Sequence, residues 1–157
     1  MKDIILNLEF LGKEIVPISE KYQTIGQLAG ENKQQVLVIL LSAQYEIIEF
    51  KALLEKILAS VGLHPQQDVL TFALTSHIPF NLLRLAAEKN CTKVIVFGVP
   101  LQQMGIHRIL PKFEVVPIAN LELVISDSFP DLEADLSKKN KLALWNALKI
   151  LMEVENG

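Results

Sequence analysis

Polar side chains follow two apolar runs of the chain, at the points where each run ends, and their types could support chemistry. The candidates are Ser42, Gln44, Tyr45, Ser76 and His77. If the runs 36–41 and 69–74 are neighbouring parallel strands, Ser42 and His77 could form a nucleophile and its general base. Ser42 lacks the flanking glycines of a nucleophile elbow, and no acid is evidently placed to orient His77. We therefore favour the alternative in which these groups only cap strand ends.

Other kinds of ligand site have weaker support in the sequence. A phosphate-binding loop needs glycines that let backbone amides approach the ligand, and none follows the first apolar run until residue 62. Asp127, Asp131, Glu133 and Asp135 could hold calcium or magnesium, although their segment lacks the glycine and the terminal acid of an EF-hand loop. The single cysteine, Cys91, excludes an internal disulfide and a multi-cysteine metal site. We therefore predict no cofactor and no bound metal.

The elements that position these side chains are predicted from the spacing of apolar residues. The run 36–41 is short, contains several β-branched residues and is polar at both ends, which is typical of a strand buried on both faces of a parallel sheet. Further strands are predicted at 69–74 and 93–98, and residues 113–117 and 121–125 are two more strand candidates, for which the sequence does not show whether both pair in the sheet. Helices are predicted at 47–61, at 79–90, after Pro100 and from about Ser137 onward. This alternation predicts an α/β fold with three layers, α/β/α, around a mostly parallel central sheet of four to five strands.

Composition and charge limit the class of protein. The chain has 157 residues, of which 50% are hydrophobic and 21% charged, as expected for one packed domain. The net charge of −3 provides no basic surface for a phosphate backbone, so direct nucleic-acid binding is predicted to be weak or absent. The sequence shows neither a signal peptide nor an apolar run of membrane-spanning length, so we predict a cytoplasmic protein without a membrane partner.

The N-terminal part of the chain differs from the rest. We predict an apolar N-terminal arm at residues 1–18, a linker at 19–34 and the α/β domain at 35–157. In the arm, Ile4, Leu8 and Leu11 fall on one face of a short helix. Such an arm either folds back on its own domain or docks on a partner protein, and the sequence leaves both possibilities open.

From residue 36 onward, the order of motifs resembles the uracil-DNA glycosylase superfamily. The resemblance is carried by the first strand, a helix ending in Leu58-Ala59-Ser60-Val61-Gly62-Leu63, a second strand ending at Thr75, the segment Val94 to Gly98, and the segment Pro130 to Trp145. It implies a uracil-DNA glycosylase-like fold.

The catalytic positions of that superfamily are not matched. Leu41-Ser42-Ala43-Gln44-Tyr45 replaces the expected Gly-rich, acidic loop, Ser76 replaces an asparagine that reads the flipped base, and Phe129 replaces a histidine. An enzyme that acts on an extruded base needs hydrogen-bonding partners for the edge of that base. We therefore predict a vestigial pocket, with a divergent glycosylase-like enzyme or hydrolase as the alternative. Its residues are Ser42, Gln44, Tyr45, Ser76, His77 and Phe129.

Size and organisation are similar to the psi subunit family of bacterial DNA polymerase III. The matching segments are Leu8-Glu9-Phe10-Leu11-Gly12-Lys13-Glu14-Ile15 in the arm and Asn140-Lys141-Leu142-Ala143-Leu144-Trp145-Asn146-Ala147-Leu148 near the end. In that family the arm docks on the clamp loader and the body binds the chi subunit. The family has an isoleucine directly after the glycine, whereas this chain places Lys13 and Glu14 there. The resemblance implies docking residues in the arm, namely Leu8, Leu11, Gly12, Ile15 and Val16.

The resemblance to the psi family also implies a function. The chain would be a non-catalytic, protein-binding subunit of the bacterial DNA replication machinery, bridging a clamp loader and another replication protein. Its partners would be clamp-loader and chi-like subunits, and any polymerase activity would belong to the holoenzyme.

Overall fold

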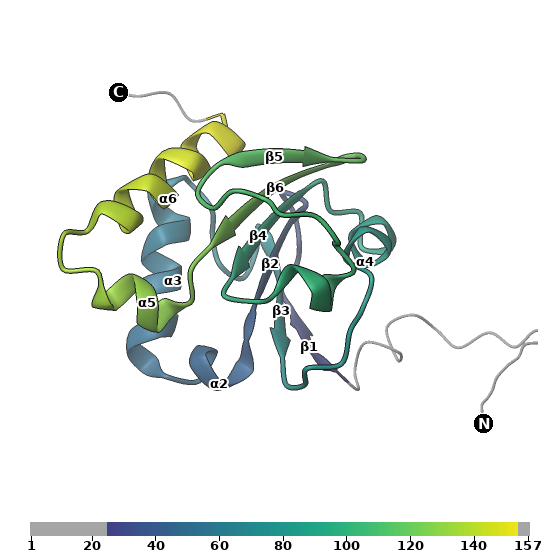
Figure 1. The fold of residues 1–157 in the computed structure, drawn as a ribbon, viewed down its shortest axis with the longest axis horizontal. Coiled ribbons are helices and arrows are strands. Elements are labelled where there is room, and N and C mark those ends of the chain that lie inside the picture. The colour runs from purple at the N-terminus through teal and green to yellow at the C-terminus, as the bar shows by residue number, and fades with distance from the viewer. Residues whose placement is uncertain (1–24, 154–157) are drawn as a thin grey trace, which may run out of the picture.

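A six-stranded sheet runs through residues 25–153, the part of the chain that the computed structural model describes (Figure 1). The strands are β1 (Gly26–Ala29), β2 (Val36–Leu41), β3 (Val69–Leu74), β4 (Lys93–Phe97), β5 (Val115–Ile118) and β6 (Leu121–Ser126). Their order is β1-β3-β2-β4-β6-β5. The four inner strands are parallel, and the edge strands β1 and β5 are each antiparallel to their neighbour. A mostly parallel sheet is therefore confirmed, but the expected number of four to five strands is wrong.

Strand β1 accounts for part of this difference. It lies within residues 19–34, which we expected to form a linker, and it pairs with β3 from Gly26 opposite Leu74 to Ala29 opposite Thr71. A Cβ atom on Gly26 would lie 2.6 Å from the Phe72 ring, so glycine lets this short strand pass close to that side chain. The folded sheet therefore begins before the boundary that we placed at residue 35.

The two late strand candidates, whose pairing the sequence left open, both join the sheet. β5 and β6 form an antiparallel hairpin whose closing pair is Ile118 opposite Leu121, and Ala119 in the turn has a φ of 52°. Pro117 lies in β5, the edge strand, where a residue without a backbone N–H is tolerated.

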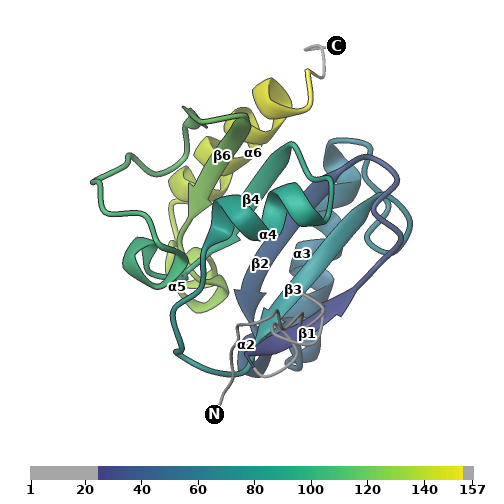
Figure 2. The same cartoon turned by 90° about the vertical axis from the view of Figure 1, so that its right-hand side faces the viewer.

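Helices cover both faces of the sheet (Figures 1 and 2). They are α2 (Ser42–Tyr45), α3 (Ile48–Ser60), α4 (Leu82–Glu88), α5 (Phe129–Ala134) and α6 (Lys139–Leu151), with a short 3-10 helix η1 (Leu101–Met104). The helices predicted after the first and second strands and near the end correspond to α3, α4 and α6. Helix α4 begins after Pro79 because the Asn81 side chain accepts a hydrogen bond from the Arg84 N–H and caps it.

The core has two halves, one on each face of the sheet. Alternate residues of β2 point to opposite faces, so Leu37 and Ile39 pack with α4, whereas Val38 and Leu40 pack with α3, α5 and α6. Both sets are completely buried, as predicted for a strand covered on two sides. No helix among residues 25–153 is both long enough and apolar enough to cross a membrane.

Candidate functional site

The carboxyl edge of the sheet is the first region to consider, because open parallel sheets bind ligands there. The four parallel strands end at Leu41, Leu74, Phe97 and Ser126. The residues predicted to form a vestigial pocket follow three of these ends, as the sequence indicated. Their local hydrogen bonds and packing decide what this edge can do.

Ser42 opens helix α2, and its hydroxyl donates to a local acid. The Ser42 Oγ atom lies 3.3 Å from Glu46 Oε2, one helical turn later. Glu46 is not one of the predicted pocket residues, and the spacing of four residues is the sequence signal for its pairing with Ser42. The Ser42 hydroxyl is therefore hydrogen-bonded to a carboxylate on its own turn.

Ser76 and His77 lie in the loop after β3, and this loop is fixed by backbone contacts. The Ser76 hydroxyl accepts a hydrogen bond from the Ile78 N–H at 3.0 Å, while the Ser76 carbonyl accepts one from Gln103 Nε2 at 3.0 Å. Gln103 is buried, and its own carbonyl accepts from the Phe80 N–H at 2.8 Å. His77 is exposed. Gln103 thus positions the loop, a role that no motif in the sequence indicates.

Gln44 and Tyr45 occupy the turn between β2 and α3 and are partly buried. The amide oxygen of Gln44 is shielded from solvent and has no hydrogen-bond partner within residues 25–153. The Tyr45 ring packs against the core, and the Lys51 ammonium lies 5.3 Å from the ring centroid. This turn is therefore held mainly by apolar packing.

Phe129, the last of the predicted pocket residues, is completely buried. Its ring stacks on Phe97 at the end of β4, with ring centroids 4.6 Å apart, and lies 6.1 Å from the ring of Phe50 on α3. Stacked aromatic rings at these separations attract one another beyond their burial. The rings of Phe129, Phe97 and Phe50 therefore fill the space beside the end of β4.

Gly98 brings α5 close to the end of β4. It has a φ of +71°, and a Cβ atom at this position would lie 2.6 Å from Ser128 Cβ and 2.8 Å from Ser128 Cα. Ser128 in turn caps α5, since its hydroxyl accepts a hydrogen bond from the Asp131 N–H at 3.4 Å. Glycine at position 98 thus allows the approach that buries Phe129.

Three of the four acidic side chains that could have held a cation interact with separate partners. Asp127 pairs with Lys112 at 2.6 Å, and Glu133 pairs with Lys141 at 3.2 Å. Asp135 accepts hydrogen bonds from the Ser137 hydroxyl at 2.6 Å and from the Asn140 N–H at 2.7 Å. These bonds, that from Ser137 foremost, lower the pKa of Asp135. Within residues 25–153 no three His, Cys, Asp or Glu side chains are grouped as metal ligands.

Cys91 is a core residue. Burial is the main effect on its thiol and raises its pKa, while a hydrogen bond to the Asn32 side chain, with Sγ 3.6 Å from Oδ1, acts in the opposite direction. A raised pKa keeps the thiol protonated, which disfavours a nucleophilic role.

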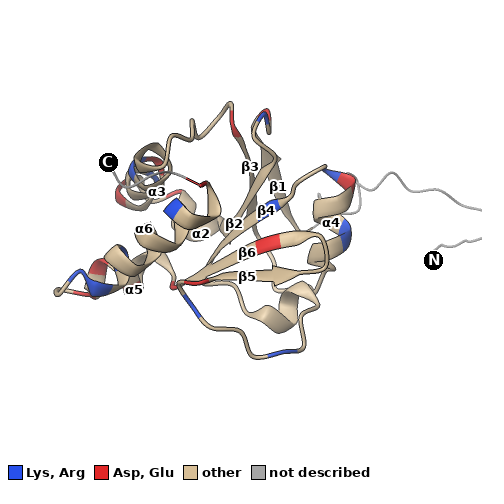
Figure 3. Cartoon of the chain, turned by 90° about the horizontal axis from the view of Figure 1, so that it is seen from above, with Lys and Arg blue, Asp and Glu red and all other residues tan. Residues whose placement is uncertain are grey.

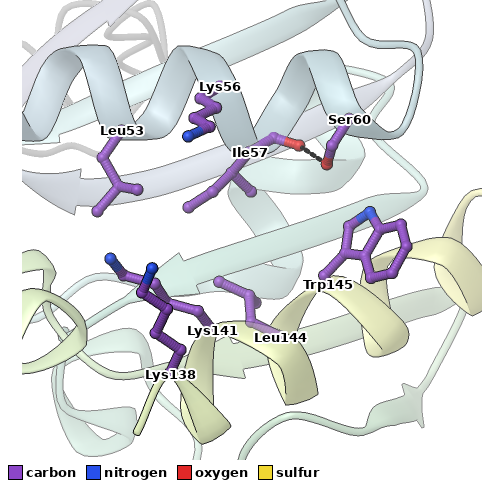
Figure 4. Close-up of a pocket in the computed structure, with 8 residues that line it drawn as sticks. All are labelled: Leu53, Lys56, Ile57, Ser60, Lys138, Lys141, Leu144 and Trp145. Carbon is purple, nitrogen blue, oxygen red and sulfur yellow. Dashed lines mark hydrogen bonds between the residues drawn. The ribbon is translucent and has the colours of Figure 1, made fainter. Parts of the chain in front are cut away.

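A second region, the α3–α6 groove, was not predicted from the sequence. It is a pocket of about 330 Å³ between the two helices (Figure 4). Its lining residues are Leu53, Lys56, Ile57, Ser60, Lys138, Lys141, Leu144 and Trp145. Trp145 is 39% exposed, whereas the neighbouring Leu144 is 1% exposed.

Charges of one sign predominate around this groove, although the surface as a whole is mixed. Figure 3 shows acidic and basic positions interspersed around α5 and the start of α6. The residues that line the groove include three lysines and no acid. One of these lysines, Lys141, forms an ion pair with Glu133. The groove is therefore apolar with a cationic rim.

The docking residues predicted in the arm lie outside the described residues, so the structure places none of them. They are Leu8, Leu11, Gly12, Ile15 and Val16.

Comparison of the chain with protein-family models and with curated protein sequences finds no match. The carboxyl edge and the α3–α6 groove are therefore the features from which a function can be inferred.

Proposed function

We propose that this protein is a non-catalytic, protein-binding subunit, similar to the psi subunit, that bridges a clamp loader and another protein of the bacterial replication machinery. The observation that carries the proposal is the burial of Phe129 in a stack with Phe50 and Phe97. Phe129 is the residue at which the resemblance to the glycosylases implies a histidine. We also propose that the fold is uracil-DNA glycosylase-like, which the parallel inner strands and the helices on both faces support.

The hydrogen bonds at the carboxyl edge support a role without catalysis. The Ser42 hydroxyl donates to Glu46, and the Ser76 hydroxyl accepts from the Ile78 N–H. Side chains engaged in this way stabilise the turns that carry them. Reading an extruded base would require hydrogen-bonding groups directed into a pocket.

Two measurements test this proposal. Deletion of residues 1–18 from the full chain should leave the far-UV circular dichroism and the melting temperature nearly unchanged and should abolish co-purification with the clamp loader of the native cell. A matched control changes polar positions of the arm, Asn7→Ala and Glu9→Ala, and should retain the complex. Co-purification that survives the deletion would remove the arm from the proposal.

The second measurement is a glycosylase assay on uracil-containing single-stranded DNA. We expect no base release above that of a buffer control. Robust release that is lost in Ser42→Ala or His77→Ala would contradict the proposal and establish the enzyme instead.

A further inference from the structure

The α3–α6 groove presents apolar side chains that the fold leaves partly uncovered. Leu53 and Ile57 point into the groove from α3, and Leu144 and Trp145 point into it from α6, with Trp145 at the end of the groove near Ser60 (Figure 4). The two aliphatic side chains of α3 are only half-buried, and Trp145 is 39% exposed. Leu144 lies beneath them and is buried. An apolar side chain inserted between the helices would therefore remove the exposed surface of three neighbouring hydrophobic side chains from water.

The charges around the groove indicate the chemistry of the occupant. Figure 4 shows the ammonium groups of Lys138 and Lys141 at one end and the Trp145 indole at the other. Lys56 adds a third ammonium group from α3, and only Lys141 is neutralised within the described residues, by Glu133 at 3.2 Å. A ligand with carboxylates beside an apolar side chain would match this arrangement.

We propose that the α3–α6 groove binds a short acidic segment of a partner protein, with one large apolar side chain between the helices and carboxylates beside Lys56, Lys138 and Lys141. This inference rests on the proposed function as a protein-binding subunit, and it names the surface of the body and the chemistry of the partner segment.

The contacts of Trp145 favour a peptide over nucleic acid. The Lys149 ammonium lies 3.7 Å from the centroid of the Trp145 ring and covers one of its faces, so a base cannot stack there. The remaining apolar lining is aliphatic, so the groove offers no second ring on which a base could stack. A peptide needs only a few local charge pairs and one buried side chain.

The test begins with an unbiased selection. A random-peptide phage library is selected on the full chain, and peptides that also bind the variant Lys56→Glu/Lys138→Glu/Lys141→Glu are discarded. We expect the remaining peptides to combine two or more acids with a large apolar residue. An enrichment of basic or uncharged peptides, or the recovery of no peptide, would overturn the inference.

Trp145 then reports binding directly, because it is the only tryptophan in the chain. A selected peptide, made synthetically, should change the Trp145 fluorescence. The triple charge reversal should weaken its affinity by about tenfold or more, because it replaces three attractive charges by repulsive ones. Added salt should weaken binding in the same direction. A single-stranded oligonucleotide that shifts the signal at lower concentration than the peptide would contradict the inference.

Two controls separate charge from folding. Lys33→Glu/Lys51→Glu/Arg108→Glu changes the net charge equally at exposed positions that do not line the groove, and it should leave peptide affinity within about twofold. Lys138→Gly removes one ammonium group at a position with a φ of 59°, where glycine relieves backbone strain, so weaker binding cannot be attributed to unfolding.

These experiments distinguish failure of the groove inference from failure of the proposed function. Clamp-loader binding through the arm together with no selected peptide would overturn only the groove inference. Base release in the glycosylase assay would overturn the proposed function whether or not the groove binds a peptide.

Discussion

The carboxyl edge of the sheet and the α3–α6 groove lie on the same face of the sheet and differ in how they use an aromatic residue. At the edge, Phe129 is completely buried between Phe97 and Phe50. In the groove, Trp145 is 39% exposed beside half-buried aliphatic side chains. The first region is filled by the protein's own core, whereas the second leaves room for another molecule. An aromatic residue near a candidate site therefore indicates binding only when its neighbours leave it uncovered.

The largest difference between the two regions should appear on truncation of these aromatic residues. Phe129→Ala should lower the free energy of unfolding by about 3–5 kcal/mol, because it leaves a cavity among rings that cannot collapse onto it. Trp145→Ala should lower it by no more than about 1 kcal/mol, as for a partly exposed residue. Urea unfolding followed by far-UV circular dichroism measures both values. Equal losses would mean that the groove is part of the core.

The close approach of α5 to β4 can be tested at Gly98. Gly98→Ala places a methyl group against the Ser128 backbone at a φ of +71°, and we expect a loss of about 2 kcal/mol or more in unfolding free energy. Gly62→Ala is the matched control, because Gly62 has a φ of +80° and nothing lies within 4 Å of the added Cβ. It should cost about 1 kcal/mol. Similar losses in thermal melts of the two variants would show that the Ser128 contact is unimportant.

Gln44 tests whether the carboxyl edge retains any polar function. Its amide oxygen is buried without a partner, so Gln44→Met should leave stability unchanged or raise it by about 1 kcal/mol. The urea midpoint measures this effect. A clear loss of stability would mean that the amide makes an essential polar interaction, and the edge would then resemble a site more than a core.

Replacement of Asp135 should have the smallest effect on stability. Asp135 lies in the turn that carries Lys138, so this change tests how that end of the groove is held. The pKa of Asp135 is lower in the folded protein than its ordinary value of 3.8. The ionised carboxylate therefore stabilises the fold above that value, and this contribution is lost as the pH falls through the lower, folded pKa. Asp135→Asn should flatten the dependence of melting temperature on pH in this acidic range. An unchanged dependence would show that the Ser137 and Asn140 hydrogen bonds contribute little.

The parts of the fold that the sequence predicted are those buried on two sides. β2 and β3 have continuous apolar sequences because helices cover both of their faces, and their bounds match the prediction. β1 was missed because a four-residue edge strand that contains glycine has little apolar pattern of its own. Its existence depends on β3 and Phe72, which are distant in the sequence.

The candidate site was predictable only in part. Ser42 and Ser76 could be identified because they follow the ends of predicted strands, and this position does not depend on the conformation of the loops. Their partners Glu46 and Gln103 depend on the conformation of the turns, which the sequence does not specify. The groove was missed because helical spacing locates the apolar residues of α6 but does not show how much of that surface α3 covers. The lysines at positions 138 and 141, beside Trp145, were the available signal.

The strand order also determines whether two surfaces of this protein are far enough apart to be occupied at the same time. β1 forms one edge of the sheet, while α6 contacts β6 and β5 at the far edge. Figure 1 shows β1 and the α3–α6 pair on different sides of the molecule. A peptide lodged beside Trp145 would therefore leave the β1 edge of the sheet accessible. A second molecule at that edge would not have to displace the peptide, so a ternary complex could form.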